Sequence, residues 1–204
     1  MIVIIDYNMG NVGSIANMIK HVGGTSVLSN RREDIESAEK IILPGVGSFD
    51  TGMKNLELIN IRSILDKKVL IEKTPILGIC LGMQILSKSS EEGILKGLGY
   101  IEAETIKFAF DKNSNLNIPH MGWNDVEVNL ENKGLFVDMY PNPRFYFDHS
   151  YHLSCKNDKE VMGISEYGYK FASAIHVDNI YGVQFHPEKS HKYGMKIFEN
   201  FINQ

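Results

Sequence analysis

The chain has 204 residues, of which 43% are hydrophobic and 23% are charged, and its formal net charge is −4. This length and balance are typical of one globular domain, so residues 1–204 are interpreted as a single domain. The mild acidity and the scattered basic residues argue against nucleic acid as a main partner. The apolar start, Met1 to Tyr7, is interrupted by Asp6, is too short to span a membrane, and lacks the features of a signal peptide.

Strand and helix patterns alternate through the first 90 residues. Short apolar runs predict strands, and apolar residues three or four apart predict helices. In chain order the pattern predicts a strand at 3–5, a helix at 14–21 ended by Gly23-Gly24, a strand at 25–28, a short helix at 32–39, a strand at 41–43, a helix at 56–70, a strand at 76–79 and a helix at 81–87. This alternation predicts an α/β fold, in which an open, mostly parallel sheet is flanked by helices.

The second half has a different pattern. Residues 144–151, with the sequence RFYFDHSY, alternate aromatic and polar side chains as a strand does. Two further strands are predicted at 171–175 and 180–185, with a turn at 177–179 between them. We expect these strands to form an antiparallel extension of the same sheet, followed by a final helix at 190–202.

The sequence Gly78-Ile79-Cys80-Leu81-Gly82 joins a predicted strand directly to the next helix. A residue at such a sharp turn is held in a strained conformation at the sheet edge, and glycines two positions before and after it prevent a collision. The amino end of the following helix also favours a thiolate over a thiol. A free cysteine can equally be a small buried hydrophobe, so this pentapeptide alone leaves both interpretations open.

The second cysteine, Cys155, lies in the sequence LSCKND and has no comparable context, so it is interpreted as a structural residue. Two cysteines in a domain of this size do not make a disulfide framework. The sequence therefore predicts a reducing, cytoplasmic location in which Cys80 is a free thiol.

A nucleophilic cysteine requires a general base that a third group orients. His186 ends the predicted strand at 180–185 and is followed by Pro187, which forces the chain to turn. Glu188 lies two residues further on, where its carboxylate can fold back to the imidazole and stabilise the imidazolium. A strand-terminal histidine beside a solvated glutamate is the plainer interpretation of His-Pro-Glu alone, but together with Cys80 the order favours a catalytic triad.

An oxyanion formed at this edge of the sheet would need backbone donors. The N–H of Leu81, directly after the proposed nucleophile, is one. The sequence Pro44-Gly45-Val46-Gly47 follows another predicted strand, and its glycines allow N–H groups near Val46 and Gly47 to approach a ligand. A plain turn is the alternative interpretation of this loop.

Three motifs in this chain, PGVGSFD, GICLGMQ and QFHPEKS, together resemble the class I, triad-type glutamine amidotransferases. Within that family, PHMGWN at 119–124, SSEEG at 89–93, FDHSY at 147–151 and the opening IIDYNMGNVGS resemble the glutaminase subunits of imidazole glycerol phosphate synthase. The resemblance runs from Met1 to the final helix.

The resemblance implies that Cys80 attacks the side-chain amide of glutamine, that His186 transfers the proton and that Glu188 orients His186. It implies no metal and no cofactor. The substrate-binding positions of the family match the residues Gly47, Gln84, Glu92, Ser150 and Tyr151. Gln84 lies one helical turn after Cys80, so it can face the same cleft; a solvated helix residue is the alternative.

The resemblance also implies a partner. Family members form a heterodimer with a (β/α)₈ cyclase barrel, and the ammonia crosses the interface instead of entering water. Asn11, Trp123 and Lys189 are the residues that this resemblance implies at or near the interface. Trp123 could also be a core aromatic, although tryptophan and methionine are enriched at interface centres.

The sequence departs from the family pattern at Asn8, where glycine is common, and at Asp148, where an apolar residue is common. The sequence HPEKSHKYG is also similar to paralogous glutaminases that supply ammonia to a sugar-amidinating synthase. Three alternatives therefore remain beside the cyclase-coupled glutaminase: such a paralogue, a non-catalytic subunit kept for assembly, and a cysteine peptidase on a related sheet. The residues Cys80, His186 and Glu188 argue against the second, and Gln84 with the 44–47 loop argues against the third.

Overall fold

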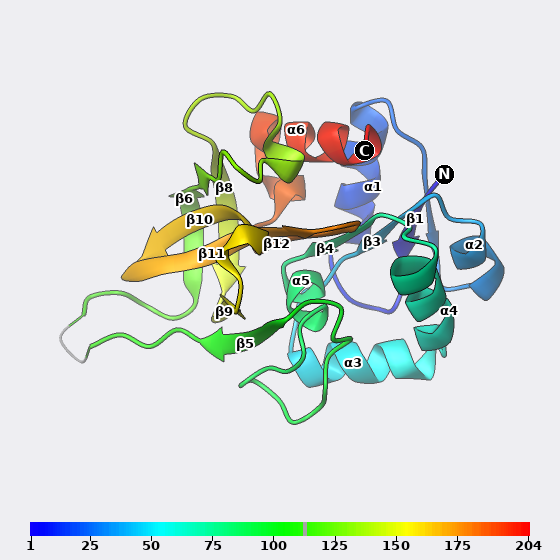
Figure 1. The fold of residues 1–204 in the computed structure, drawn as a ribbon, viewed down its shortest axis with the longest axis horizontal. Helices are drawn as coiled ribbons and strands as arrows, with labels where there is room; N and C mark the ends of the chain where they lie inside the picture. The colour runs from blue at the N-terminus through cyan, green and yellow to red at the C-terminus, as the bar shows by residue number, and fades with distance from the viewer. Residues whose placement is uncertain (112–113) are drawn as a thin grey trace.

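The structure, a computed structural model, describes residues 1–111 and 114–204 (Figure 1). The helices are α1 (Val12–His21), α2 (Arg32–Glu36), α3 (Phe49–Leu58), α4 (Arg62–Asp66), α5 (Leu81–Ile85) and α6 (His191–Ile202). A π-helical segment, η1 (Lys67–Ile71), follows α4, and the short 3₁₀ helices are η2 (Gly134–Phe136), η3 (Asp158–Glu160) and η4 (Pro187–Lys189).

Among the described residues, ten strands form one mixed sheet and two form a separate ribbon. The strands of the sheet are β1 (Ile2–Ile5), β2 (Ser26–Ser29), β3 (Lys40–Leu43), β4 (Ile76–Ile79), β5 (Ala103–Lys107), β7 (Glu127–Val128), β9 (Tyr151–Cys155), β10 (Val161–Tyr167), β11 (Tyr169–Val177) and β12 (Ile180–Val183). The ribbon consists of β6 (His120–Asp125) and β8 (Arg144–His149), which pair antiparallel.

The sheet has a parallel half and an antiparallel half. Its main order is β2-β1-β3-β4-β12-β11-β10-β7, and β9 joins β11 to β5. The pairs from β2 to β12 are parallel, whereas β12–β11, β11–β10 and β10–β7 are antiparallel. This arrangement confirms the predicted fold class, an open parallel sheet with an antiparallel extension.

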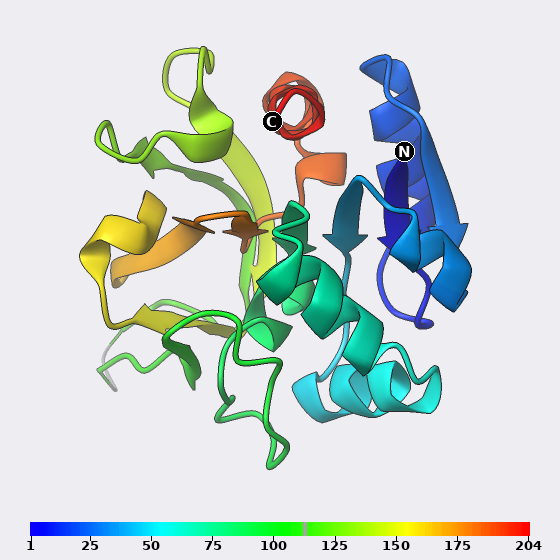
Figure 2. The same ribbon diagram turned by 45° about the vertical axis from the view of Figure 1, so that its right-hand side comes forward.

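Alternating side chains of β1 divide the core into two layers. Ile2 and Ile4 pack in a cluster with residues of α1 and α6, and Val3 and Ile5 pack in a second cluster with residues of α3, α4 and α5. Figures 1 and 2 show α1 and α6 on one side of the sheet and α3 and α5 on the other. Because both faces are covered, the parallel strands β1 and β4 are buried along their whole length, as their near-continuous apolar sequences predict.

The prediction of a single helix at 56–70 was wrong. The chain instead forms α3, α4 and η1, and the break between α3 and α4 falls at Asn60, whose φ is +51°. This left-handed residue ends α3, and its N–H bonds to the carbonyl of Glu57. The apolar spacing continues through the break because α3 and α4 both face the same layer of the core, which is why the periodicity suggested one helix.

The predicted strand at 144–151 is divided at Ser150. β8 pairs with β6 in the ribbon, outside the main sheet, whereas β9 pairs with β5 and β11. The strand at 171–175 is confirmed as part of β11. The strand predicted at 180–185 is confirmed as β12 but ends two residues earlier, at Val183, and the turn lies between the two strands. β5, β6, β7 and β10 had not been predicted.

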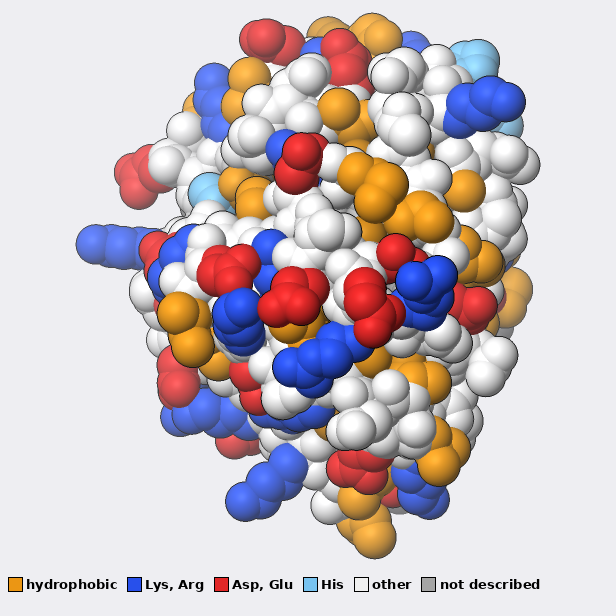
Figure 3. Space-filling model, turned by 90° about the vertical axis from the view of Figure 1, so that its right-hand side faces the viewer, with side chains coloured by type: hydrophobic (Ala, Val, Ile, Leu, Met, Phe, Trp, Pro, Cys, Tyr) orange, Lys and Arg blue, Asp and Glu red, His pale blue; other side chains and the backbone are white. Residues whose placement is uncertain are grey.

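The surface that carries α2 and α4 has interspersed acidic and basic side chains (Figure 3). Several form ion pairs, including Lys67 with Glu36 and Arg62 with Asp66. Within residues 1–111 and 114–204, none of the helices combines the length and the apolar character needed to cross a bilayer.

Candidate active site

Cys80 occupies the turn between β4 and α5 and has a φ of +52° and a ψ of −111°. Such a conformation is strained for any residue with a Cβ atom. A Cβ atom on Gly78 would lie 2.8 Å from the carbonyl carbon of Gly82, and a Cβ atom on Gly82 would overlap the carbonyl oxygen of Leu43. The two flanking glycines therefore let α5 pack directly against β4 and β3, and this packing holds Cys80 in the strained turn.

His186 reaches the same edge of the sheet because β12 is the parallel neighbour of β4. Val183 pairs with Ile79, and the N–H of Cys80 continues the ladder by bonding to the Val183 carbonyl at 2.8 Å. After Val183 the chain runs on to His186, whose N–H bonds to the Tyr146 carbonyl of the ribbon at 2.8 Å. The carboxyl ends of two adjacent parallel strands therefore bring Cys80 and His186 together.

His186 and Glu188 form a buried pair. The imidazole Nδ1 lies 2.9 Å from Glu188 Oε1, and the two side chains are only 2% and 1% exposed. Burial lowers the pKa of His186, but the negative charge of Cys80, a hydrogen bond to its sulfur and the hydrogen bond to Glu188 outweigh burial and raise this pKa to about 10. With Nδ1 engaged by Glu188, Nε2 is the nitrogen left for the sulfur. The arrangement favours the protonated form of His186, the imidazolium.

A cavity of about 230 Å³ opens beside Cys80. Its lining contains the oxyanion and substrate positions expected from the sequence, together with two residues of the ribbon and one residue before it. The lining residues are Val46, Gly47, Cys80, Leu81, Gln84, Glu92, Pro119, Asp148, His149, Ser150 and Tyr151. Residues from five separate parts of the chain thus converge on one hollow at the sheet edge.

The loop 44–47 packs against the turn that carries Cys80. A Cβ atom on Gly45 would lie 2.8 Å from the Gly82 nitrogen and 2.9 Å from the Tyr7 hydroxyl, so only glycine fits there. Tyr7 is fully buried and donates its hydroxyl to the Pro44 carbonyl. Gly47 has a φ of +123°, a conformation that L side chains rarely adopt, and Val46 beside it is 50% exposed.

The backbone conformation at Asn8 explains why asparagine can replace the glycine that is common in the family at this position. Its φ is +60°, in the left-handed region where glycine and asparagine are the favoured residues. The following segment contacts the 44–47 loop, since a Cβ atom on Gly10 would lie 3.1 Å from the Gly45 nitrogen and one on Gly47 would lie 3.0 Å from the Met9 Cε. The second departure, Asp148, lines the cavity, and its carbonyl oxygen lies 3.9 Å from the Cys80 sulfur.

Gln84 and Glu92 both have partners within the protein. The Gln84 side chain is buried, and its Nε2 donates to the Tyr151 carbonyl at 3.0 Å and to Gln184 Oε1 at 3.1 Å. The solvated alternative for Gln84 is therefore excluded. Glu92 Oε2 accepts a hydrogen bond of 2.8 Å from the N–H of Phe49, the first residue of α3. Glu92 thus caps a helix as well as lining the cavity.

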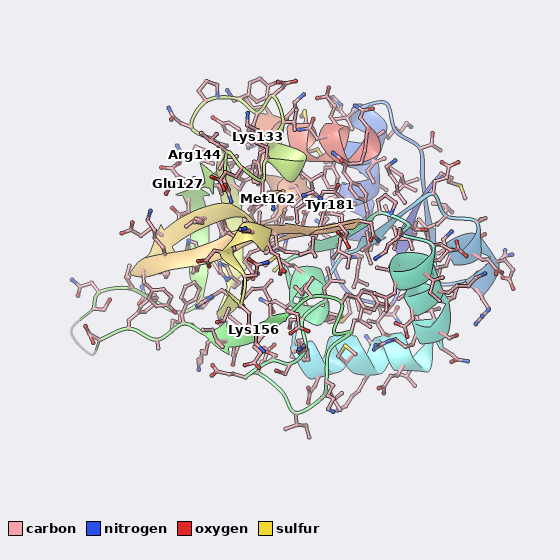
Figure 4. All side chains as sticks on the ribbon, in the orientation of Figure 1. Glu127, Lys133, Arg144, Lys156, Met162 and Tyr181 are labelled. Carbon is pink, nitrogen blue, oxygen red and sulfur yellow. The ribbon has the colours of Figure 1, made fainter. Side chains whose placement is uncertain are left out.

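Two of the expected interface residues lie close together on the ribbon side. Trp123 is 39% exposed and stacks on His191 with a centroid distance of 5.6 Å, and the Arg144 guanidinium lies 5.6 Å from the centre of the Trp123 ring. Figure 4 labels Arg144 at this end of the ribbon. The Lys189 ammonium lies 5.3 Å from the centre of the Tyr146 ring, the ribbon partner of Trp123. The third, Asn11, caps α1 through a hydrogen bond from the Ser14 N–H.

Sequence reasoning did not assign roles to two buried histidines near the cavity. His149 Nδ1 lies 2.8 Å from the Tyr151 carbonyl, and His149 Nε2 lies 2.9 Å from His120 Nδ1. Burial lowers the pKa of both, well below the ordinary value for His149 and to about 4 for His120. Both are therefore neutral, and the carbonyl fixes the proton of His149 on Nδ1. Their place in the quoted motifs PHMGWN and FDHSY was the available signal.

Neither Cys80 nor Cys155 forms a disulfide bond, and burial raises the pKa of Cys155 to about 12. Across the part of the chain that the structure describes, no group of three or more His, Cys, Asp or Glu side chains is arranged to hold a metal ion. The candidate reactive groups at this edge of the sheet are the sulfur of Cys80, the imidazole of His186 and the carboxylate of Glu188.

Comparison with known proteins gives the class first. A family model described as glutamine amidotransferase class-I matches residues 3–204, so the chain belongs to the class I glutamine amidotransferases. Among solved structures, a glutamine amidotransferase gives a TM-score of 0.69 at 20% identity over 96% of this chain and 98% of its own. PurLQS from Thermotoga maritima gives a TM-score of 0.70, also at 20% identity, over 99% and 97%. These two likenesses concern the fold.

Sequence relatives narrow the assignment. The chain is 57% identical over 204 residues, all of both proteins, to the imidazole glycerol phosphate synthase subunit HisH 2 of Methanococcus maripaludis. It is 46% identical to the HisH 2 subunit of Pseudomonas aeruginosa, over 99% of this chain and 98% of the relative, and 46% identical to HisH of Leptospira interrogans over the full length of both. Within the class, the chain belongs to the HisH-type glutaminase subunits.

Proposed function

We propose that this chain hydrolyses glutamine to glutamate and ammonia through Cys80, His186 and Glu188, and that it passes the ammonia to a (β/α)₈ cyclase subunit of imidazole glycerol phosphate synthase. The observation that carries the proposal is the buried His186–Glu188 pair, 2.9 Å apart, at the same sheet edge as the sulfur held in the strained turn, with the pKa of His186 raised by the charge of Cys80. A strand-to-helix turn that presents a nucleophile beside an oriented base is the geometry of covalent hydrolysis.

The first half of the reaction makes a thioester. The Cys80 thiolate attacks the side-chain carbonyl carbon of glutamine, and the negative charge on the resulting oxyanion is received by backbone N–H groups of Leu81 and of the loop at Val46 and Gly47. His186 then gives its proton to the amide nitrogen, the carbon–nitrogen bond breaks, and ammonia leaves. Glu188 holds the imidazolium in place, as the third member of a triad does.

The second half regenerates the thiolate. A water molecule gives a proton to neutral His186 and attacks the thioester carbonyl, and the carbon–sulfur bond breaks to release glutamate. The sulfur recovers its negative charge and His186 recovers its proton. The reaction consumes one glutamine and one water and yields one glutamate and one ammonia.

The lining of the cavity supports the proposed substrate positions. Gly47, Gln84, Glu92, Ser150 and Tyr151 all border the space next to Cys80. The carboxylate of Glu92 is suited to the α-ammonium group of glutamine, and the backbone N–H and hydroxyl groups of Ser150 and Tyr151 are suited to its carboxylate. A small cavity lined by a few convergent polar groups is typical of an amino-acid site.

The relatives support the partner. Proteins similar to this chain over their full lengths are named as subunits of imidazole glycerol phosphate synthase, which favours a heterodimer with the cyclase and a role in histidine biosynthesis. The half-exposed Trp123 and the neighbouring Lys189 offer an interface surface, and Asn11 is the third residue proposed for it. A cytoplasmic location remains a prediction.

A second acceptor for the ammonia is the alternative. Two of the relatives carry the number 2 in their names, which points to more than one HisH subunit in those organisms. A duplicated subunit is where a changed partner, such as a sugar-amidinating synthase, would arise. Identification of the barrel protein that copurifies with the chain from its native cell separates the two possibilities, and stimulation only by the histidine-pathway cyclase excludes the paralogue.

The decisive test uses the complex. Wild-type chain should hydrolyse glutamine weakly alone and strongly with the ligand-bound cyclase, whereas a folded Cys80→Ala variant should be inactive in both states. Residual activity of that variant in the complex contradicts the proposal. A glutamine-analogue electrophile that does not label Cys80 in the complex would instead support a non-catalytic assembly subunit.

A further inference from the structure

Gln184 is a fully buried side chain that the proposed mechanism does not use. It is 0% exposed, directly follows β12, and lies between Cys80 and Gln84. Its Nε2 lies 3.7 Å from the Cys80 sulfur, and its Oε1 accepts from Gln84 Nε2 at 3.1 Å. A buried amide in direct contact with a reacting sulfur is a candidate for a role in the chemistry.

The orientation of the Gln184 amide follows from its neighbours. The Tyr151 carbonyl can only accept a hydrogen bond, so the group that Gln84 presents to it at 3.0 Å must be the NH₂ group. Because the same NH₂ group also faces Gln184, the atom of Gln184 on that side must be the oxygen. The NH₂ group of Gln184 is then on the opposite side, directed at the sulfur.

A second chain of hydrogen bonds leads to the same carbonyl. His149 donates from Nδ1 to the Tyr151 carbonyl at 2.8 Å, and His120 donates from Nδ1 to His149 Nε2 at 2.9 Å. Asn124 Nδ2 lies 3.2 Å from His120 Nε2, the acceptor nitrogen that remains. In each of these contacts only one of the two groups can be the donor. The Tyr151 carbonyl, which orients Gln84, is therefore itself held in place by a hydrogen-bond network in which every donor and acceptor is fixed.

We propose that Gln184 is a further catalytic group, which stabilises the Cys80 thiolate by donating a hydrogen bond from its side-chain amide to the sulfur. This proposal rests on the proposed role of Cys80 as the nucleophile. A thiolate receives more from a hydrogen-bond donor than a neutral thiol does, so the contact favours the reactive form. Gln184 thus adds a neutral donor to the sulfur, while His186 supplies the counter-charge.

Other ionisable groups surround the sulfur, and replacing Gln184 removes none of them. His186 comes from the turn before η4, Tyr7 from the loop after β1, and Asp148 and His149 line the cavity from β8. A change in the alkylation rate of the Cys80 sulfur on replacing Gln184 therefore reports the loss of the Gln184 amide.

The test is the rate of alkylation of Cys80 by iodoacetamide across pH, measured on the full isolated chain. A Cys155→Ser background removes the second thiol. Gln184→Met keeps the length of the side chain and removes the donor, and it should slow alkylation at neutral pH about tenfold and move the midpoint of the profile to higher pH. Tyr181→Phe, which removes one side-chain hydrogen bond from the adjoining strand β12 at a residue labelled in Figure 4, should leave the profile unchanged.

An unchanged profile in folded Gln184→Met would overturn the proposal, whatever the effect on stability. If that variant does not fold, the wild-type chain still gives an answer through the NMR signals of the Gln184 side-chain NH₂ group. These should shift with pH at the midpoint of alkylation and lose that step in Cys80→Ala, and a pH-independent signal contradicts the contact. Neither readout requires glutamine hydrolysis. Failure of the proposed glutaminase function would therefore be seen separately, as residual glutamine hydrolysis by Cys80→Ala in the complex with the cyclase.

Discussion

The sulfur of Cys80 lies where it does because the residues two positions before and after it have no side chain. A Cβ atom at position 82 would overlap the Leu43 carbonyl oxygen, and one at position 78 would press on the backbone of Gly82. The positive φ of Cys80 is therefore maintained by backbone packing of α5 against β3 and β4. The strain at this residue is balanced by the buried apolar side chains of the surrounding strands.

The Gly82→Ala variant tests this packing. We expect a loss of about 3 kcal/mol in the free energy of unfolding, because the extra methyl group meets rigid backbone. Gly13→Ala in α1 is the matched control, since its added Cβ would meet no atom within 4 Å beyond the adjoining backbone of its own helix, and it should stabilise the chain by about 0.5 kcal/mol. Chemical denaturation measures both, and equal effects of the two substitutions would contradict the packing argument.

We expect the charge on Glu188 to help keep His186 protonated at alkaline pH. Burial lowers the pKa of His186, but the interactions with Cys80 and then with Glu188 raise it to about 10, so the imidazolium persists up to that pH. Glu188→Gln removes a negative charge, and the pKa of His186 should fall. The alkaline limb of the pH–rate profile of glutamine hydrolysis by the complex should then move to lower pH, and a limb that stays in place contradicts the assigned role of Glu188.

At the scale of elements, α3 is joined to the site through its first residue. Ser48 makes no side-chain capping bond, and the Phe49 N–H is instead bound by Glu92 from a loop that lines the cavity. The carboxylate also lies at the positive end of the α3 dipole. The proposed substrate position and the cap of α3 are therefore the same side chain.

Glu92→Ala should show both effects. We expect a loss of about 1 kcal/mol in stability from the missing cap, together with a higher KM for glutamine. Glu91→Ala is the control, because Glu91 accepts from the Lys107 N–H at the surface without lining the cavity, so its KM should not change. A normal KM in Glu92→Ala would remove Glu92 from the substrate site.

The elements that were predictable are those whose signals are local. The apolar strands β1, β3 and β4 and the turn at Cys80 are specified by residues next to one another. The strand β6, with the sequence HMGWND, has no apolar alternation and exists because it pairs with β8, so its signal is not local. The same limit applies to the site: Cys80, His186 and Glu188 could be named from motifs, whereas the role of Gln184 depends on a contact with Gln84, 100 positions away.

At the scale of the whole molecule, the sheet edge and the ribbon place the cavity close to an exposed aromatic surface. Trp123 lies beside His191 and Arg144, with part of its ring system open to solvent. A rigid, partly exposed tryptophan next to a basic side chain is typical of an interface centre. The proposed cyclase would cover this surface and the mouth of the site together.

Trp123→Ala should weaken binding of the cyclase about 30-fold, equivalent to about 2 kcal/mol, because truncating a central aromatic anchor removes most of its buried contact. Leu58→Ala on α3, where the leucine is 81% exposed, serves as the control and should bind normally. Isothermal titration calorimetry measures both. Alkylation of Cys80 in the isolated Trp123→Ala chain should be unaltered, and equal affinities of the two variants for the cyclase would contradict the interface.

Everything in the proposed mechanism depends on a covalent bond to one sulfur. The most direct measurement is mass spectrometry of the complex with the cyclase, acid-quenched during turnover of glutamine and then digested. The account predicts a γ-glutamyl thioester on the peptide that contains Cys80, which accumulates during turnover and is absent from Cys80→Ser. A glutamyl adduct on Cys155 would contradict the account. Hydrolysis at full rate by Cys80→Ser, with no adduct on either cysteine peptide of the wild-type chain, would also contradict it.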